Sequence, residues 1–546
     1  MPPLPDAAPE APARRAPSLL RAAGLIAVIT VLAKLLGALR DWQIFQAYGA
    51  SITSDAYFAA VQIPSFAIVL LGGLGGPFHT AIVGVFSRLI DAGERPSTLA
   101  RQLASTVLTL TGGAFSLLSI LVFFYAEPLL RALLPGGDPA MIAMAATHLR
   151  IMAPVMLLGG VIGVFYGLVN VYHSYVWPSL SPAALNVAMI LALIAFPEDP
   201  AHANGNLLAW ATLAGAVFQV ALQLPDFLRF GFTLKPSLAA WRSIELRQIG
   251  EVLFPMMIGV TIGQLMTYVD MLFAARLAEG GWSAVVLSNR LLQLPIGVLQ
   301  TAFLVPVFPR FSRAVADQRW DDLRRDFRMG VVSLWFISLP ILTLLLLLSE
   351  PAIRVAFQHG RFDAGDTRLV TLALVFQAFQ MLPYFARDTL TRVFYAFQDS
   401  VTPMLVGFLA IGVKYLLNAA LVSHYGIGGI TLSTTLITLL NMTVLAIALK
   451  GRHGVTLGVA AMARSFGKLA IAAGVTGLAL WALTDPLTRF LIARGLQGAG
   501  ADLTLMAVVS LAGAALYLAL TWALRVPEAD ALFARVGLRR NRLNDA

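Results

Sequence analysis

The sequence predicts an all-α polytopic membrane protein with two six-helix pseudo-repeat lobes around a central cavity and two extra C-terminal helices. Composition gives the first reason, because 58% of the 546 residues are hydrophobic and only 12% are charged. A soluble domain carries roughly twice that charged share. The second reason is that about 14 stretches are apolar over roughly the 20 residues that a membrane helix needs. The third reason is an internal repeat.

The apolar stretches follow one another along almost the whole chain. A Pro- and Ala-rich segment, 1–18, precedes them and predicts a disordered tail. The predicted spans are centred on 19–46, 56–76, 103–125, 143–170, 179–196, 206–226, 250–278, 284–308, 329–349, 368–396, 402–422, 428–449, 466–484 and 502–524.

The repeat consists of landmark residues that occur twice, roughly 230 positions apart. Two facing repeats in a membrane enclose a central cavity in many transporters. An old duplication without a functional role is the alternative. The recurring sets are Asp41, Pro64, Phe86-Ser87-Arg88, Phe165-Tyr166 and Asn186 in the first half, and Asp270, Pro295, Phe311-Ser312-Arg313, Phe394-Tyr395 and Asn418 in the second.

Loop charge sets the orientation, because Lys and Arg concentrate in the loops on one side and predict cytoplasmic termini. An even number of spans agrees with this arrangement. The predicted organisation is a cytoplasmic tail at 1–18, an N-lobe at 19–230, a cytoplasmic linker at 231–249, a C-lobe at 250–450, the two extra helices at 451–525 and a cytoplasmic C-terminal tail at 526–546.

Several function classes are disfavoured by the composition. The net charge of +10 lies in short loops, which indicates topology signals and contacts to membrane lipids rather than nucleic acid. The chain has no cysteine, so disulfides and thiolate metal sites are excluded. No phosphate-cradling loop or His/Glu metal cluster is recognisable. We therefore expect a transporter rather than an enzyme, without a cofactor, driven by the membrane potential or by Na⁺ or H⁺.

Charged residues inside the predicted spans need a reason, because each is costly to insert. Lys34, Arg40 and Asp41 lie in the first span, Arg290 in the eighth and Lys414 in the eleventh. Cations outnumber anions, and guanidinium groups suit phosphate oxygens, which predicts an anionic substrate. The alternative is that each charge is paired or reaches a headgroup. Arg387 and Asp388, for example, are adjacent in the tenth span.

A glycine-rich segment interrupts the second predicted span. Such backbone is tolerated at membrane depth where it lines a cavity, so we expect a hinge or a broken helix beside the substrate. The residues are Gly72, Gly73, Gly75, Gly76 and Pro77.

Five segments resemble the MurJ/MviN family, bacterial lipid II flippases of the multidrug/oligosaccharidyl-lipid/polysaccharide exporter superfamily. The resemblance covers the first twelve spans, and the segments occur in the family's order. They are LGALRD at 36–41, SDAYF at 54–58, NRLLQLPIGV at 289–298, AFQHGRF at 356–362 and FYAFQDSVTP at 394–403.

The resemblance implies that lipid II moves from the inner to the outer leaflet of the bacterial inner membrane by alternating access, for cell-wall synthesis. It also implies a groove for the lipid tail at 451–525, with the cell-wall synthesis machinery as an expected partner. The residues carried over as substrate-binding are Arg40, Asp41, Lys34, Asp55 and Arg290. A flippase for another lipid-linked saccharide and a multidrug/cation antiporter of the same superfamily are the alternatives.

The sequence departs from the family pattern at several positions. Ile68 and Gly73 replace a charged pair of the second span, and Gln293 replaces an acidic residue. Some members bind Na⁺ in the second lobe, and the positions matching that site are Asp270, Asn418, Thr434 and Thr438. The second carboxylate of that site falls on Val422, so weak Na⁺ binding and protonation of Asp270 both stay open.

Overall fold

The computed structural model describes residues 19–71, 76–90, 95–199, 203–277, 279–303 and 308–526, and all nineteen regular elements in them are helices. The all-α fold class is thereby confirmed. The predicted disordered tail at 1–18 and the segment 527–546 lie outside the described residues.

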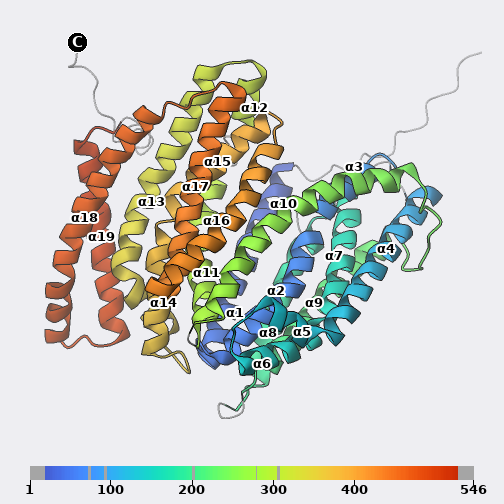
Figure 1. Cartoon of the computed structure of the whole chain (residues 1–546), viewed down its shortest axis with the longest axis horizontal. Helices are drawn as coiled ribbons and strands as arrows, with labels where there is room; N and C mark the ends of the chain where they lie inside the picture. The colour runs from blue at the N-terminus through green and yellow to red at the C-terminus, as the bar shows by residue number, and fades with distance from the viewer. Residues whose placement is uncertain are drawn as a thin grey trace, which may run out of the picture.

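The first bundle corresponds to the predicted N-lobe (Figure 1). It comprises α1 (Leu19–Tyr48), α2 (Ile52–Leu71), α3 (Pro77–Phe86), α4 (Thr98–Phe124), α5 (Ala126–Leu133), α6 (Pro139–Met152), α7 (Pro154–Val171), α8 (Val176–Ala195) and α9 (Asn206–Arg229).

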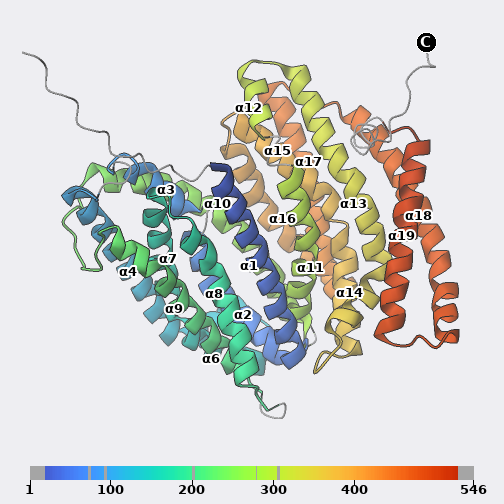
Figure 2. The same ribbon diagram turned by 180° about the vertical axis from the view of Figure 1, so that it is seen from behind.

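The second bundle lies beside the first, and the last two helices pack against α13 on its far side (Figures 1 and 2). It comprises α10 (Ile244–Ala274), α11 (Gly281–Phe303), α12 (Phe308–Ala316), α13 (Trp320–Phe357), α14 (Ala364–Ala378), α15 (Met381–Ala396), α16 (Val401–Tyr425) and α17 (Ile427–His453), followed by the pair α18 (Val459–Ala493) and α19 (Ala499–Ala523).

Twelve of the described helices are long and apolar enough to cross a membrane, or thirteen spans if the bent pair α14 and α15 counts as one. The predicted count of fourteen is therefore not confirmed. The remaining predicted span, 19–46, falls on α1, which carries Lys34, Arg40 and Asp41. The fourth predicted span is two helices, because α6 ends at Met152 and α7 starts at Pro154.

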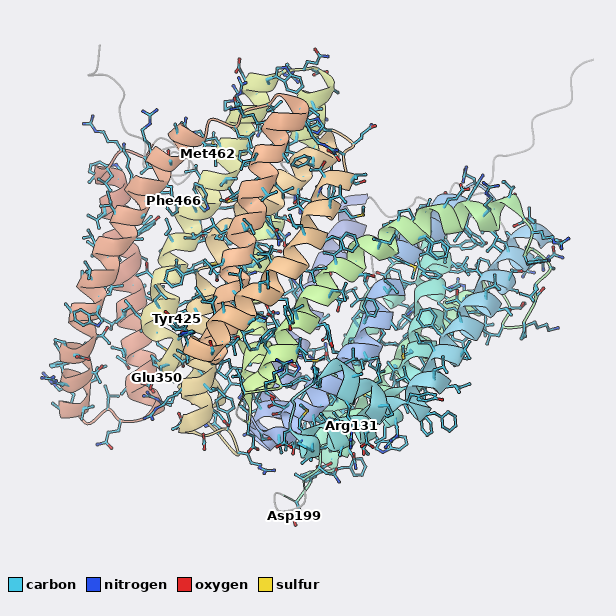
Figure 3. All side chains as sticks on the ribbon, viewed as in Figure 1. Arg131, Asp199, Glu350, Tyr425, Met462 and Phe466 are labelled. Atoms are coloured by element: carbon cyan, nitrogen blue, oxygen red, sulfur yellow. The ribbon has the colours of Figure 1, made fainter. Side chains whose placement is uncertain are left out.

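The outer surface of the bundles is strongly apolar, as a lipid-facing surface must be. Phe124 is 70% exposed, Leu511 73% and Trp481 68%. Arg131 and Asp199 lie at one end of the molecule, whereas Met462 lies towards the other, terminal end (Figure 3). The exposed apolar side chains thus fit a helix bundle surrounded by lipid, with Arg131 and Asp199 at one of its ends.

Helix α10 connects the two lobes. It packs against α2 and α3 of the first lobe and against α16 and α17 of the second, and it arches between them in Figure 1. It begins earlier than the predicted span at 250, because the Ser243 side chain accepts a hydrogen bond from the backbone N–H of Leu246 and caps the helix.

Candidate functional site

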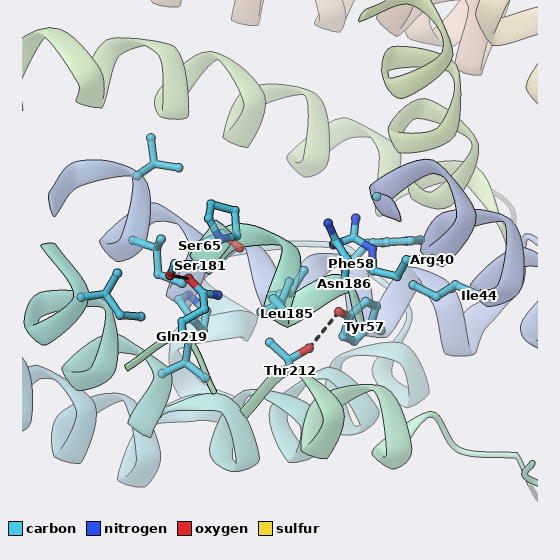
Figure 4. Close-up of a pocket in the computed structure, with 18 of the residues that line it drawn as sticks. Arg40, Ile44, Tyr57, Phe58, Ser65, Ser181, Leu185, Asn186, Thr212 and Gln219 are labelled. Carbon is cyan, nitrogen blue, oxygen red and sulfur yellow. Dashed lines mark hydrogen bonds between the residues drawn. The ribbon is translucent and has the colours of Figure 1, made fainter. Parts of the chain in front are cut away.

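A cavity of about 510 Å³ opens in the inner face of the first lobe (Figure 4). The sequence predicted a cavity shared by both lobes, but the first lobe supplies the lining and the second contributes only Arg290 from α11. Two of the polar contacts in the lining join uncharged side chains: the Tyr57 and Thr212 hydroxyls lie 3.0 Å apart, and Ser181 donates to Gln219 at 3.3 Å.

A cluster of three charged side chains lies at this cavity, and we call Arg40, Asp41 and Arg290 the cavity cluster. The Arg40 guanidinium donates to Asp41 Oδ1 from Nε at 2.9 Å and from Nη2 at 2.6 Å. Arg290 forms an ion pair with the same carboxylate oxygen, and its guanidinium lies 5.0 Å from the ring centroid of Phe58. Two guanidinium groups thus share one carboxylate, which leaves the cluster net positive.

The cluster joins the two lobes, since Arg40 and Asp41 lie on α1 and Arg290 on α11. The three side chains differ in exposure: Asp41 is 9% exposed, Arg40 17% and Arg290 34%. The Asp41 carboxylate is therefore enclosed, and the Arg290 side chain is the most exposed of the three.

Asn186 of α8 completes the cluster and was not predicted as a site residue. Its Oδ1 accepts from Arg40 Nη1 at 2.9 Å, and its Nδ2 donates to the backbone oxygen of Ala33 at 3.1 Å. The amide thereby fixes the Arg40 side chain. The only sequence signal for it was its recurrence as Asn418 in the repeat.

Lys34 lies outside the cavity lining. Its side chain is exposed, and its Nζ lies 3.1 Å from the position that a Cβ on Gly297 of α11 would occupy. The residue is thus close to the second lobe, two turns along α1 from the cavity cluster.

Asp55 lies away from the cavity cluster, although the family resemblance grouped it with the substrate-binding residues. It is buried and accepts from the backbone N–H groups of Gly280 at 2.9 Å and Ser283 at 2.7 Å. The Ser283 hydroxyl also donates to it at 2.5 Å. Asp55 therefore caps the N-terminus of α11, where a carboxylate is favourable.

This cap is part of a seam between the lobes that we call the latch, formed by residues 46–55 against 279–283 and 360–366. The Ser54 and Ser283 hydroxyls lie 2.9 Å apart. The backbone N–H of Ala50 donates to Asp366 Oδ2 at 3.0 Å, and the N–H of Arg361 donates to the backbone oxygen of Gln46 at 2.9 Å. The latch lies at the end of the molecule opposite the start of α1 and the end of α19 (Figure 2).

Two latch glycines are required by geometry. Gly280 has φ +81° and Gly360 has φ +63°, a backbone region that L side chains rarely adopt. A Cβ on Gly280 would collide with the backbone oxygen of Ala50, and one on Gly360 with that of Gln46. The backbones of the two lobes are therefore in direct contact here.

The predicted hinge is described only in part. Gly72, Gly73 and Gly75 lie outside the described residues. Gly76 is extended and precedes α3, which begins at Pro77, a favoured first helical residue. The apolar replacement Ile68 lines the cavity, whereas Gln293 is exposed elsewhere on α11.

A second polar cluster lies inside the second lobe, and we call Asp270, Lys414, Asn418 and Thr434 the lobe cluster. Lys414 Nζ lies 2.8 Å from Asp270 Oδ2 and donates to Thr434 Oγ1 at 2.8 Å. Asn418 Nδ2 donates to Asp270 Oδ1 at 3.2 Å. The structure thus brings together three of the four residues predicted for Na⁺, with a lysine among them.

The remaining Na⁺ candidate, Thr438, contributes nothing to this cluster. Its hydroxyl donates to the backbone oxygen of Thr434 at 2.7 Å. Among the described residues no group of three or more His, Cys, Asp or Glu side chains could hold a metal ion. The donor set does not fit a Na⁺ ion, because its single carboxylate already pairs with an ammonium group.

Asp388 of α15 pairs with Arg392 rather than with its neighbour in sequence. Arg392 Nε donates to Asp388 Oδ2 at 3.2 Å, and Gln300 Nε2 of α11 donates to the same oxygen at 3.1 Å. The Arg387 guanidinium lies over the Tyr384 ring, 4.7 Å from its centroid. The interpretation that Arg387 and Asp388 neutralise each other is therefore wrong in this structure.

Comparisons with known proteins agree over most of the chain. A family model described as lipid II flippase MurJ matches residues 44–492. The probable lipid II flippase MurJ of Synechocystis sp. is 33% identical over 477 residues, 85% of this chain and 87% of that protein. The lipid II flippase MurJ of Burkholderia cenocepacia is 27% identical over 443 residues, 80% of this chain and 84% of its own.

Solved structures show the same fold. A lipid II flippase MurJ in an inward closed conformation matches with a TM-score of 0.75 and 18% identity, over 94% of this chain and 99% of that one. An inward-facing multidrug resistance MATE family transporter of the MOP superfamily matches with a TM-score of 0.60 and 14% identity, over 79% of this chain and 98% of that one.

Proposed function

The chain belongs to the lipid II flippase MurJ family, and from that premise we propose that it moves lipid II from the inner to the outer leaflet of the bacterial inner membrane by alternating access. The substrate is a lipid-linked peptidoglycan precursor that carries a diphosphate. Its delivery to the outer leaflet supplies cell-wall synthesis, so the enzymes that use it there are the expected downstream partners.

One observation carries the docking step: two guanidinium groups from opposite lobes share the single carboxylate of Asp41. A diphosphate offers several oxygens, and guanidinium groups bind such oxygens through paired charge-assisted hydrogen bonds. The incoming anion competes with Asp41 for Arg40 and Arg290. Asp41 thus keeps both guanidinium groups oriented while the cavity holds no substrate. Lys34 is a further cation close to α11.

The latch supports alternating access. Its hydrogen bonds close one end of the space between the lobes, and Asp55 provides the capping contacts at its centre. We assign the opposite end to the cytoplasm because Arg88, Arg247 and Arg324 lie there, as the positive-inside rule requires. Both termini are then cytoplasmic. Transport requires that the latch opens after the headgroup has docked.

The membrane potential can supply the driving force. Moving one elementary charge across 100 mV is worth about 2.3 kcal/mol. Because the cytoplasm is negative, outward movement of the diphosphate is favoured. The polyprenyl tail stays in lipid, and we place it beside α18 and α19, whose outer faces expose Leu478 and Leu511.

The decisive experiment replaces the two arginines of the cavity cluster. Arg40→Ala and Arg290→Ala are introduced separately into cells whose own lipid II flippase has been switched off, and lipid II translocation is measured. A hydrogen bond to a charged group contributes about 1.5–3 kcal/mol, so each variant is expected to translocate roughly 10- to 100-fold more slowly. Arg131→Ala is the matched control, because Arg131 is exposed and pairs only with Glu127 within its own helix. Normal translocation by both cluster variants would refute the docking step.

A further inference from the structure

The lobe cluster and the cavity cluster are built on the same repeated residues. Asp270 occupies the repeat position of Asp41, and Asn418 that of Asn186. In the second lobe, however, the cation comes from Lys414 of α16, and its side chain is 3% exposed. A buried ammonium group of this kind needs a specific role, because its desolvation is costly.

We propose that the Lys414 ammonium group replaces an alkali-metal ion in the second lobe. It lies between α10, α16 and α17, where such an ion would bind, so the second lobe binds no Na⁺. Transport by this chain is then independent of a Na⁺ gradient. The inference goes beyond the proposed function and does not depend on the identity of the lipid substrate.

The orientation of the oxygen donors is the first argument. A bound Na⁺ would need oxygens directed at it together with the Asp270 carboxylate. The Asn418 amide instead presents its N–H to Asp270, while its oxygen accepts from Ser433. The amide oxygen, one of the four candidate ligands, is therefore directed away from the Asp270 carboxylate.

Charge is the second argument. Lys414 already neutralises Asp270, and Val422 occupies the position where the family resemblance places a second carboxylate. Adding Na⁺ would leave an excess positive charge in an environment of low dielectric constant, where like charges repel strongly. The ammonium group reproduces the charge of the ion, and its N–H donors satisfy Asp270 and Thr434.

The position of the cluster gives the tethered cation a structural consequence. Asp270 lies in the last turns of α10, the helix that packs against both lobes. The contacts of Lys414 and Asn418 attach this end of α10 to α16, and the hydrogen bond from Lys414 to Thr434 attaches α16 to α17. This attachment persists at all Na⁺ concentrations, because its cation is part of the chain.

The test measures cation binding rather than transport. Purified full-length protein is examined by binding of ²²Na⁺ and by its thermal unfolding midpoint in NaCl and in N-methyl-D-glucamine chloride at equal ionic strength, which removes differences in screening. The proteins are the wild type, Lys414→Ala, Asp270→Asn, the double variant Asp270→Asn/Lys414→Ala, and the control Lys34→Ala, which removes a lysine of the first predicted span.

Wild type and Lys34→Ala are expected to bind no ²²Na⁺ and to unfold at the same midpoint in both salts. Lys414→Ala exposes the Asp270 carboxylate in a cavity and should gain a Na⁺-specific rise of a few degrees, as expected when an ion at roughly ten times its dissociation constant binds only the folded state. The double variant should lose that rise. If Lys414→Ala folds only in Na⁺, the inference is equally supported. Lys414→Gln, which keeps most of the side-chain length, replaces it if the alanine variant does not fold in either salt.

Saturable ²²Na⁺ binding to the wild type that Asp270→Asn abolishes would overturn the inference, and this comparison does not need a Lys414 variant. Indifference of both Lys414 variants to Na⁺ would also overturn it, because the ammonium group would then not be replacing an ion. A chain that shows the expected Na⁺ pattern and yet fails to translocate lipid II would refute the proposed function and leave this inference standing.

Discussion

The two lobes use the same pair of repeated residues to build clusters of opposite character. In the cavity cluster, Asp41 is shared by Arg40 of its own lobe and Arg290 of the other. In the lobe cluster, Asp270 is paired with Lys414 of its own lobe, and the Lys414 side chain is 3% exposed. One cluster therefore has an excess of cations and spans the lobes, whereas the other is neutral and forms within one lobe around a buried ammonium group.

The difference shows how a duplicated structure divides two tasks. Removing one partner of a buried ion pair leaves the other charge buried without a counter-charge and destabilises the fold by about 3–5 kcal/mol. The lobe cluster is therefore suited to holding α10, α16 and α17 together permanently. The cavity cluster has two cations for one carboxylate, so its excess positive charge can be taken up by another anion. We therefore expect the contacts between the lobes to change during transport and the contacts within the second lobe to persist.

The largest expected effect comes from preventing the lobes from separating. The chain has no cysteine, and the buried Ser54 and Ser283 hydroxyls lie 2.9 Å apart across the latch, close enough for a disulfide to replace them after small shifts. In Ser54→Cys/Ser283→Cys, oxidation is expected to stop lipid II translocation and reduction to restore it. Translocation is measured in spheroplasts before and after treatment with oxidant and reductant.

Each single cysteine variant is the control, because it carries the same substitution without the cross-link. Undiminished translocation by the fully oxidised protein would mean that the latch does not open during transport. It would contradict the expectation that the contacts between the lobes change while those of the lobe cluster persist.

The next prediction compares the two aspartates directly. Asp270→Asn leaves the buried Lys414 ammonium without a counter-charge and is expected to destabilise the fold by about 3–5 kcal/mol. Asp41→Asn should cost less, because Arg40 keeps its bond to Asn186 and Arg290 is more exposed than Lys414. Thermal unfolding of the purified variants in detergent measures both. Equal losses would show that the clusters do not differ in the way their burial indicates.

A smaller effect is expected when both charges of the lobe cluster are removed together. Replacing a buried ion pair by neutral groups of similar volume is often close to neutral. Asp270→Asn/Lys414→Met should therefore recover most of the stability lost by Asp270→Asn, with a coupling of about 2–3 kcal/mol. The two single variants, the double variant and the wild type form the thermodynamic cycle, measured by unfolding at one Na⁺ concentration. Simple additivity would contradict the observed contact.

Much of this architecture follows from local sequence. The apolar spans predict the helices, and the cost of placing charges in a membrane singles out Arg40, Asp41 and Arg290 by residue type and position alone. The position of Asp55 could not be predicted in the same way, since its role depends on the N–H groups of Gly280 and Ser283, over 200 residues away. The pairing of Asp270 with Lys414 could not be predicted either, because the two residues lie on different helices far apart in the sequence. Sequence shows that a charge is present, but only the fold shows which partner it meets.

The smallest contrast concerns the two repeated asparagines. Asn418 is fully buried between Asp270 and Ser433, so Asn418→Ala leaves a buried hydroxyl and a carboxylate oxygen with one partner fewer and should cost about 1–3 kcal/mol. Asn186 is nearly as buried but lies at the cavity, where water can replace it, and Asn186→Ala should cost about 0.5–1.5 kcal/mol. The main effect of Asn186→Ala should be slower translocation, because Arg40 loses the hydrogen bond that orients it. Asn418→Ala, in contrast, should lower the unfolding midpoint more than it slows transport. Measuring both properties for both variants tests the assignment, and a reversed pattern would mean that the first lobe holds the permanent cluster.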